Sequence, residues 1–90
     1  MEFENDPVKA TINLKKHRVS FEEAASVFGD PMAYTFADPD HSFREERWLM
    51  FGLSRVARVL AVVFTHRRGK NRIISAHLAT RHERKTYEEG

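Results

Sequence analysis

The stretch RIISAHLATRHERKTYEE near the end of the sequence places arginines, a lysine and two histidines on a predicted strand and the helix after it. Guanidinium groups stay charged and grip phosphate through two parallel hydrogen bonds. Histidine titrates near pH 6.5 and can take up or release a proton at neutral pH. Cations beside a proton donor suit metal-free cleavage of an RNA phosphodiester, in which the 2′-OH attacks the neighbouring phosphate.

The candidate acid or base is His77, and four arginines are candidates for holding and stabilising phosphate: Arg67, Arg72, Arg81 and Arg84. Simpler readings stand beside this one. An arginine on a C-terminal helix usually lies in water or pairs with a nearby glutamate, and a lone histidine on a strand is more often structural. The five histidines show no HxH or HExxH spacing, so we expect no metal site and no cofactor.

Alternation along the predicted last strand assigns its side chains to two faces of a sheet. We expect one face to be core and the other to place a serine and a histidine near the sheet's centre. The core face takes Ile74, Ala76 and Leu78, and the polar face takes Ile73, Ser75 and His77.

Composition is that of one soluble globular domain spanning residues 1–90, with 31% charged and 41% hydrophobic residues. Residues 1–45 carry 5 Lys/Arg and 9 Asp/Glu, whereas residues 46–90 carry 10 and 4. A basic second half favours a polyanion or an acidic protein as partner. The chain has no cysteine, and its acidic start, MEFENDP, does not have the pattern of a signal peptide, so we expect a cytoplasmic protein.

The first half predicts a short edge strand at Glu2–Glu4 and two helices. The first helix begins at Asp6-Pro7 and reaches about His17, with an apolar side offered by Val8, Ile12 and Leu14. The second begins at a capping box formed by Ser20 and Glu23. It carries Phe21, Ala24, Ala25 and Phe28 on one face and ends at Gly29.

Four strands follow, over Met32–Asp38, Glu46–Leu53, Val59–Arg67 and Arg72–Ala79. The last two are joined by a hairpin turn through Gly69. A second capping box, Thr80 with Glu83, opens a helix that reaches Tyr87. The order β-α-α-β-β-β-β-α predicts an α+β fold, an antiparallel meander with helices packed on the sheet.

Three motifs, NLKKHRVSFEEAASVFGDP, EERWLMFGLS and RIISAHLATRHERKTYEE, resemble the BrnT toxins of bacterial type II toxin–antitoxin systems in the right order over nearly the whole chain. The resemblance implies a RelE-like fold and a ribonuclease that cuts RNA without metal and arrests translation and growth. It also implies a BrnA-like antitoxin with a ribbon-helix-helix domain. Operator DNA would be bound only through that antitoxin.

The resemblance and the chemistry above together give two sets of candidate residues. The catalytic candidates are His77, Arg67, Arg72, Glu46 and Arg84. The RNA-binding candidates are Lys16, His17, Arg47, Ser75, Arg81, Lys85 and Tyr87.

Three positions depart from the family's usual pattern. Arg18 stands where the family has a glycine, and a left-handed C-cap there costs an arginine extra. His77 replaces an arginine, and His66 replaces a glutamate that could serve as a base. Two alternatives therefore stay open: a catalytically weakened homologue that binds an antitoxin as a co-repressor module, and a basic domain that binds nucleic acid without cutting it.

Overall fold

The computed structural model describes residues 3–38 and 46–90, so Glu2 of the predicted first strand lies outside the described residues. The elements are, in order, β1 (Phe3–Glu4), α1 (Pro7–His17), α2 (Phe21–Ser26), the 3-10 turn η1 (Val27–Gly29), β2 (Tyr34–Ala37), β3 (Trp48–Leu53), β4 (Val59–Arg67), β5 (Lys70–Leu78) and α3 (Arg81–Glu89). This order confirms the predicted α+β fold. No helix in the described ranges combines the length and the apolar character needed to cross a bilayer.

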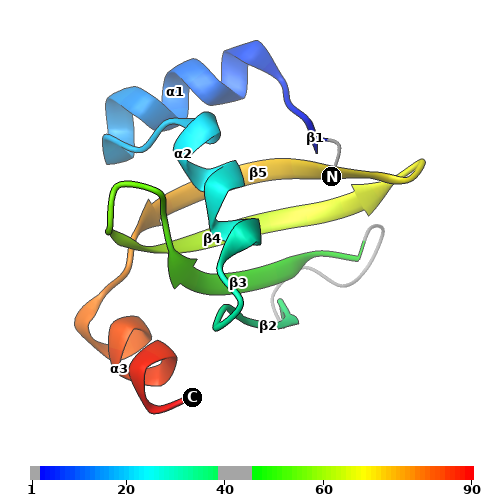
Figure 1. The fold of residues 1–90 in the computed structure, drawn as a ribbon. Helices are drawn as coiled ribbons and strands as arrows, with labels where there is room; N and C mark the ends of the chain where they lie inside the picture. The colour runs from blue at the N-terminus through cyan, green and yellow to red at the C-terminus, as the bar shows by residue number, and fades with distance from the viewer. Residues whose placement is uncertain (1–2, 39–45) are drawn as a thin grey trace.

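The five strands form one sheet in the order β1-β5-β4-β3-β2. β1 runs parallel to β5, and the other neighbours are antiparallel. Figure 1 shows α2 lying across one face of this sheet, α1 alongside β5, and α3 at the end where β3 and β5 finish. We call the face covered by α2 the front face and the opposite one the back face.

The hydrophobic core lies between α2 and the front face. Leu60 and Val62 of β4 are fully buried there, together with Ala24 of α2 and Val27 of η1. The predicted apolar face of the second helix is therefore confirmed, because Phe21 is also buried. Each large aliphatic side chain removed from water in this way contributes roughly 1.5–3 kcal/mol, which fixes the sheet under α2.

The helix starts follow the predicted caps with one correction. Asp6 accepts a hydrogen bond from Val8 N at 2.9 Å, and Thr80 and Glu83 form the complete capping box of α3. Ser20 caps α2 by accepting from Glu23 N at 3.0 Å. The reciprocal half of that box is not formed, because the Glu23 carboxylate turns instead to Ser54 and Arg58.

The hairpin between β4 and β5 forms at the predicted turn. Arg68 and Gly69 both take positive φ angles, 52° and 77°, between the paired residues Arg67 and Lys70. Two left-handed residues in succession make the type I′ turn that matches the twist of the two strands. The glycine takes this conformation without the steric cost that Arg68 bears.

The predicted alternation of β5 is wrong at Ile73. Phe64 pairs with Ile73 and Val63 pairs with Ser75, so Ile74 is an extra residue that makes a β-bulge. Because of this bulge, Ile73 and Ala76 both point into the front-face core. The prediction grouped Ile73 with Ser75 and His77, since an unbroken period of two cannot place positions 73 and 76 on the same side.

The predicted apolar side of α1 is not a core side. Val8, Ile12 and Leu14 are 66%, 57% and 50% exposed. The residue that α1 buries is Asn13, whose side-chain amide donates to Ala76 O at 2.8 Å and to Val19 O at 2.9 Å. Its Oδ1 accepts from Ala76 N at 3.0 Å. The amide therefore pairs with the edge of β5 as a neighbouring strand would, which satisfies a buried backbone N–H and C=O.

Candidate active site

The bulge in β5 decides which polar side chains share the back face. Directly paired residues of neighbouring strands lie on the same face, and the pairs are Ala61 with His77 and Val63 with Ser75. Beyond the bulge, Thr65 pairs with Arg72. Arg72 consequently lies on the same side of the sheet as Ser75 and His77, whereas an unbulged strand would have turned it to the opposite side.

His77 is held by a carboxylate from the next element. Its Nε2 lies 2.9 Å from Oε1 of Glu83, and the same oxygen accepts a hydrogen bond from Thr80 N at 2.9 Å. The side chains of His77 and Glu83 are 33% and 19% exposed. No other residue in the described part of the chain bonds the second ring nitrogen, Nδ1, so this atom can exchange a proton with a ligand.

A second histidine lies beside the first. The ring centroids of His17 and His77 are 5.9 Å apart, because α1 ends next to the edge of β5. Burial lowers the pKa of His17 below its ordinary 6.5, and the positive charges of His77 and Lys16 lower it further. His17 is therefore neutral at pH 7 and is suited to accepting a proton.

Beside these histidines, α1 and β5 enclose a groove of about 240 Å³. Its lining residues are Lys9, Ile12, Asn13, Lys16, His17, Ile74 and Ser75. The predicted residues Lys16, His17 and Ser75 thus come together next to His77. We call the group Lys16, His17, Ser75, His77 and Glu83 the histidine end of the sheet.

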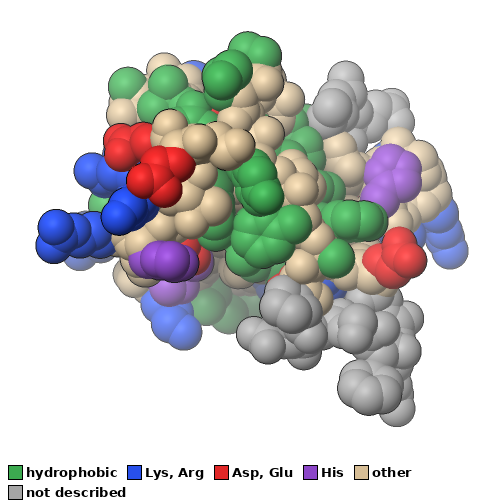
Figure 2. Space-filling view, turned by 90° about the horizontal axis from the view of Figure 1, so that it is seen from below, with side chains coloured by type: hydrophobic (Ala, Val, Ile, Leu, Met, Phe, Trp, Pro, Cys, Tyr) green, Lys and Arg blue, Asp and Glu red, His purple; other side chains and the backbone are tan. Residues whose placement is uncertain are grey.

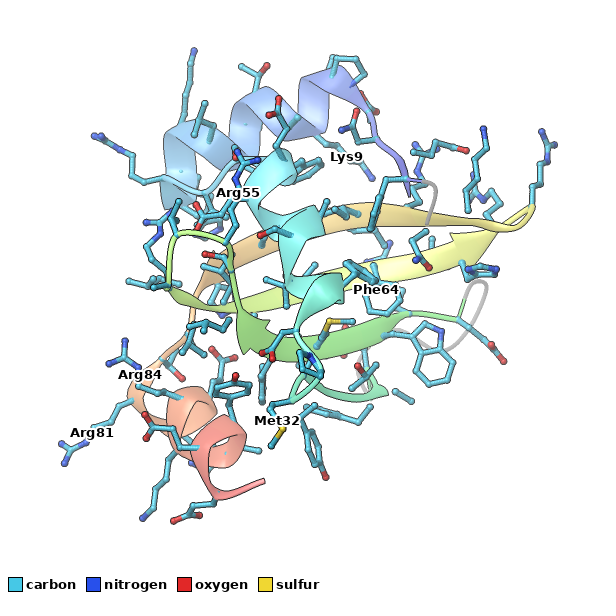
Figure 3. All side chains as sticks on the ribbon, in the orientation of Figure 1. Lys9, Met32, Arg55, Phe64, Arg81 and Arg84 are labelled. Atoms are coloured by element: carbon cyan, nitrogen blue, oxygen red, sulfur yellow. The ribbon has the colours of Figure 1, made fainter. Side chains whose placement is uncertain are left out.

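The predicted cations of α3 stand near the histidine end without a partner side chain among the described residues. Figure 3 shows Arg81 and Arg84 extending from the first turn of α3 away from the ribbon. Both are exposed, as is Lys85. The fourth predicted residue of this helix, Tyr87, is placed differently: its hydroxyl donates to Asp30 Oδ2 at 2.7 Å. This bond to Asp30 raises the pKa of Tyr87 to about 12 and ties α3 to the loop before β2.

The other predicted residues lie at the opposite end of the same strands. Arg72 pairs with Glu4 of β1 at 2.5 Å, and Arg67 is the last residue of β4. Glu46 and Arg47 lead into β3, where the carbonyl of Glu46 accepts from Thr65 Oγ1 at 2.6 Å. We call Arg67, Arg72, Glu46 and Arg47 the hairpin end. Four residue steps along β5, excluding the bulge, separate Arg72 from His77 by about 13 Å, so the catalytic candidates do not form one cluster.

Figure 2, seen from below past β2, shows the same division on the surface. Lys, Arg and His side chains, together with Asp or Glu side chains, lie at two opposite ends of the molecule, and hydrophobic side chains lie between them. A short ligand can therefore meet only one of the two cationic ends at a time.

Of the other two residues that depart from the expected pattern, His66 lies at the hairpin, whereas Arg18 directly follows His17. His66 lies on the front side of the hairpin, where its Nδ1 is 3.0 Å from Asn71 Oδ1. Arg18 caps α1 with φ 58°, as expected of a position that the family fills with glycine, and donates its N–H to Leu14 O at 3.0 Å. A glutamate at position 66 would face the side of the sheet that is opposite to His77.

Sequence reasoning missed Glu83 as the partner of His77. The signal was present, because the capping box folds Glu83 back onto Thr80, which lies three residues after His77 and two after the end of β5. The arrangement offers two imidazoles, an orienting carboxylate and nearby cations, which can move protons at a phosphate. Within the described ranges, no three His, Asp or Glu side chains are grouped so as to hold a metal ion.

Comparisons with known proteins agree with the fold. A family model described as "Ribonuclease toxin, BrnT, of type II toxin-antitoxin system" matches residues 5–83. The crystal structure of the Brucella abortus ribonuclease toxin BrnT is similar with a TM-score of 0.68 at 20% sequence identity, covering 90% of this chain and 99% of that one. No curated protein sequence matches the chain.

Proposed function

Because the chain belongs to the BrnT family, the ribonuclease toxins of type II toxin–antitoxin systems, we propose that it cleaves RNA at the histidine end of its sheet. The observation that carries this proposal is the pair of imidazoles 5.9 Å apart, one of them held by Glu83. A single scissile phosphate can reach both rings. More specifically, we propose a metal-independent endoribonuclease that inhibits translation and growth.

In the proposed mechanism, neutral His17 takes the proton of the attacking 2′-OH. The 2′ oxygen bonds to phosphorus while the bond from phosphorus to the 5′ oxygen breaks. Protonated His77 gives its Nδ1 proton to that leaving oxygen, so one proton is taken up and one is released. Glu83 fixes the ring of His77 through Nε2, which keeps Nδ1 directed at the ligand.

Cations stabilise the crowded phosphate in this scheme. Lys16 lies in the same turn of α1 as His17, and Arg81 and Arg84 lie in the first turn of α3. Hydrogen bonds to a developing phosphorane charge are worth most where the site is partly shielded from water. The arginines of the hairpin end are too distant for this role, and we assign them to phosphates further along a bound single strand.

The proposed partner is a BrnA-like antitoxin with a ribbon-helix-helix domain, through which the complex would bind operator DNA. The excess of basic residues in the second half of the chain supports contact with RNA. We do not assign the reading of DNA to α3, because this helix has only 9 residues.

One experiment tests cleavage directly. The purified protein is incubated with a single-stranded RNA in EDTA between pH 6 and pH 8. We expect cut products that end in a 2′,3′-cyclic phosphate, and growth arrest when the chain is expressed alone. RNA that stays intact under all of these conditions would overturn the proposed activity.

A second function is a catalytically weakened homologue that keeps antitoxin binding and acts as a co-repressor. It is favoured by one observation: position 77 carries a histidine bonded to Glu83 where the family has an arginine. This reading expects a stable complex with the antitoxin and tighter operator binding by that complex, with neither growth arrest nor RNA cleavage.

A further inference from the structure

Helix α1 exposes aliphatic side chains and buries a polar one. A helix on the surface of a domain normally buries an apolar stripe and exposes its polar side. Here Val8 is 66% and Ile12 is 57% exposed, while Asn13 is 5% exposed. The burial of Asn13 is explained by its bonds to β5, whereas Val8 and Ile12 are not among the described side chains that pack on the core.

The two exposed aliphatic side chains form one stripe between lysines. Val8 and Ile12 are one turn apart, so they lie next to each other on the helix surface. At 100° per residue, Lys15 lies on one side of this stripe and Lys9 and Lys16 lie on the other. The groove between α1 and β5 adjoins the second side, and Ile74 of the β-bulge lines it.

We propose that this surface binds an acidic amphipathic segment of the antitoxin. The surface consists of Val8, Lys9, Ile12, Lys15, Lys16 and Ile74, and we call it the α1 surface. Apolar side chains of the partner would cover Val8 and Ile12 and enter the groove, and its carboxylates would meet the flanking lysines. The proposal rests on the proposed function, because a toxin of a type II system requires an antitoxin.

The chemistry of the α1 surface fits a protein segment better than RNA. Both ligands can use the lysines. Proteins bind the bases of single-stranded RNA mainly by stacking them on aromatic rings or guanidinium planes. The stripe offers only branched aliphatic side chains. An amphipathic helix of the partner buries such a stripe in the same way that coiled and groove-bound helices do.

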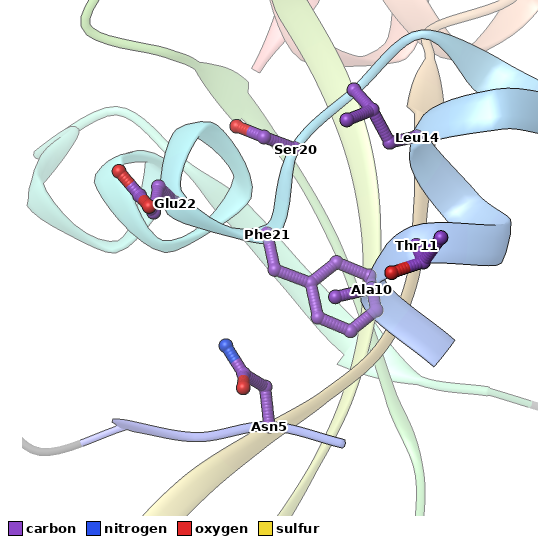
Figure 4. A pocket seen from close by; sticks show the side chains of 7 residues that line it. All are labelled: Asn5, Ala10, Thr11, Leu14, Ser20, Phe21 and Glu22. Carbon is purple, nitrogen blue, oxygen red and sulfur yellow. The ribbon is translucent and has the colours of Figure 1, made fainter. Parts of the chain in front are cut away.

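The groove beside β5 and a neighbouring hollow differ in the charge of their lining residues. Between α1 and α2 lies a hollow of about 190 Å³, shown in Figure 4. Its lining residues are Asn5, Ala10, Thr11, Leu14, Ser20, Phe21 and Glu22. This lining includes a carboxylate and no cation, whereas the groove beside β5 is lined by Lys9 and Lys16 and by no carboxylate. An acidic segment therefore fits the groove beside β5.

Binding there would also regulate the proposed site. The groove shares Lys16, His17 and Ser75 with the histidine end. A segment lying on the α1 surface would cover the cation and the base, and RNA could not reach them. Neutralisation would follow from competition for the same side chains, without a change in the fold.

The test uses two variants of the full chain and one control. Ile12→Glu places a carboxylate in the middle of the stripe, and glutamate has a higher helix propensity than isoleucine. Lys9→Glu reverses a flanking charge and leaves the stripe in place. Met32→Glu is the matched control, because Met32 is 72% exposed and lies at the far side of the sheet from Lys9 in Figure 3.

A BrnA-like antitoxin is co-expressed with each variant, and binding of the purified proteins is measured by titration. We expect Ile12→Glu and Lys9→Glu each to weaken the complex about tenfold or more, with unchanged circular dichroism and unchanged growth arrest without antitoxin. Met32→Glu should bind as the unmodified chain does.

Wild-type affinity in both variants, with folding intact, would overturn the proposal. So would loss of growth arrest in Ile12→Glu with antitoxin binding intact, since the stripe would then serve RNA. If the unmodified chain arrests no growth, the proposed function fails, and the binding titration still decides whether the α1 surface holds the antitoxin.

Discussion

The two cationic ends of the sheet differ in how their side chains are brought together. At the histidine end, α1, β5 and the first turn of α3 each supply a titratable group, and the groups meet only in the folded chain. At the hairpin end, Arg72 is already paired with Glu4, and Glu46 is held through its backbone carbonyl by Thr65. The histidine end places its titratable groups beside one groove, whereas at the hairpin end the Arg72–Glu4 ion pair joins β5 to β1.

The strongest way to break this comparison is to remove the imidazole of His77. We expect His77→Ala to reduce the RNA cleavage rate about a hundredfold or more, since general acid catalysis contributes at least that much. Thermal stability should change little, because His77 is half-buried. The matched control is His82→Ala, an exposed histidine on α3, which should cleave at the unmodified rate. Equal rates for the two variants would remove His77 from the site.

The pH profile sharpens the role of the second histidine. The pKa of His17 is lowered from 6.5 by burial and then by the charges of His77 and Lys16. A base must be unprotonated, so cleavage should fall as the pH drops through this lowered pKa. We expect His17→Ala to cost about tenfold to a hundredfold in rate and to abolish the acidic limb. His66→Ala, on the opposite face, should keep that limb, and a limb that survives in His17→Ala contradicts the assignment.

A third prediction concerns the stability of the fold at Glu23, which belongs to neither cationic end. Glu23 is 7% exposed and bonds Arg58 and Ser54 across the core edge. We expect Glu23→Gln to lower the free energy of unfolding by about 2 kcal/mol at pH 7, because it weakens the bonds of a buried carboxylate to Arg58. Urea denaturation measures this change, and Glu22→Gln is the exposed control.

The same pair makes stability depend on pH. The hydrogen bond from Arg58 lowers the pKa of Glu23 below its ordinary 4.5, against burial, and Ser54 adds to the lowering. A carboxyl with a lowered pKa in the folded state stabilises the fold above pH 4.5 and loses this contribution as the pH falls through the folded pKa. The loss of folding stability on acidification should therefore be smaller in Glu23→Gln than in the unmodified chain. Equal losses in the two proteins would contradict this account.

Removing one hydroxyl tests how α3 is attached. Burial alone would raise the pKa of Asp30, but hydrogen bonds from Leu53 N, Tyr87 and Met32 N lower it. We expect Tyr87→Phe to cost about 1 kcal/mol of stability, the usual value of one such bond, because the two backbone donors remain. Thermal unfolding measures this, with Tyr34→Phe at an exposed position as control. No difference between the two variants would show that the bond does not hold α3.

The smallest effect is expected at the hairpin end. The side chains of Arg72 and Glu4 are 24% and 35% exposed, so Arg72→Ala should cost about 0–1 kcal/mol of stability. We expect its cleavage rate to fall by less than about fivefold, as for a contact outside the reacting phosphate. A loss as large as that of His77→Ala would join the two ends into one site and end the comparison.

Local rules in the sequence determined most of the elements. Ser20 and Thr80 cap their helices, Gly69 permits the left-handed turn between β4 and β5, and Arg18 takes the C-cap that its position required. These features depend on residues within a few positions of each other, so their physical causes can be read directly along the chain.

Tertiary structure alone decided the composition of the site. The bulge at Ile74 placed Arg72 on the back face, and the bonds of Asn13 to Ala76 turned the aliphatic side of α1 outward. The approach of His17 to His77 followed from that docking. Each of these depends on hydrogen bonds between residues far apart in the chain, and such pairings are chosen by the packing of the whole sheet rather than by local propensity.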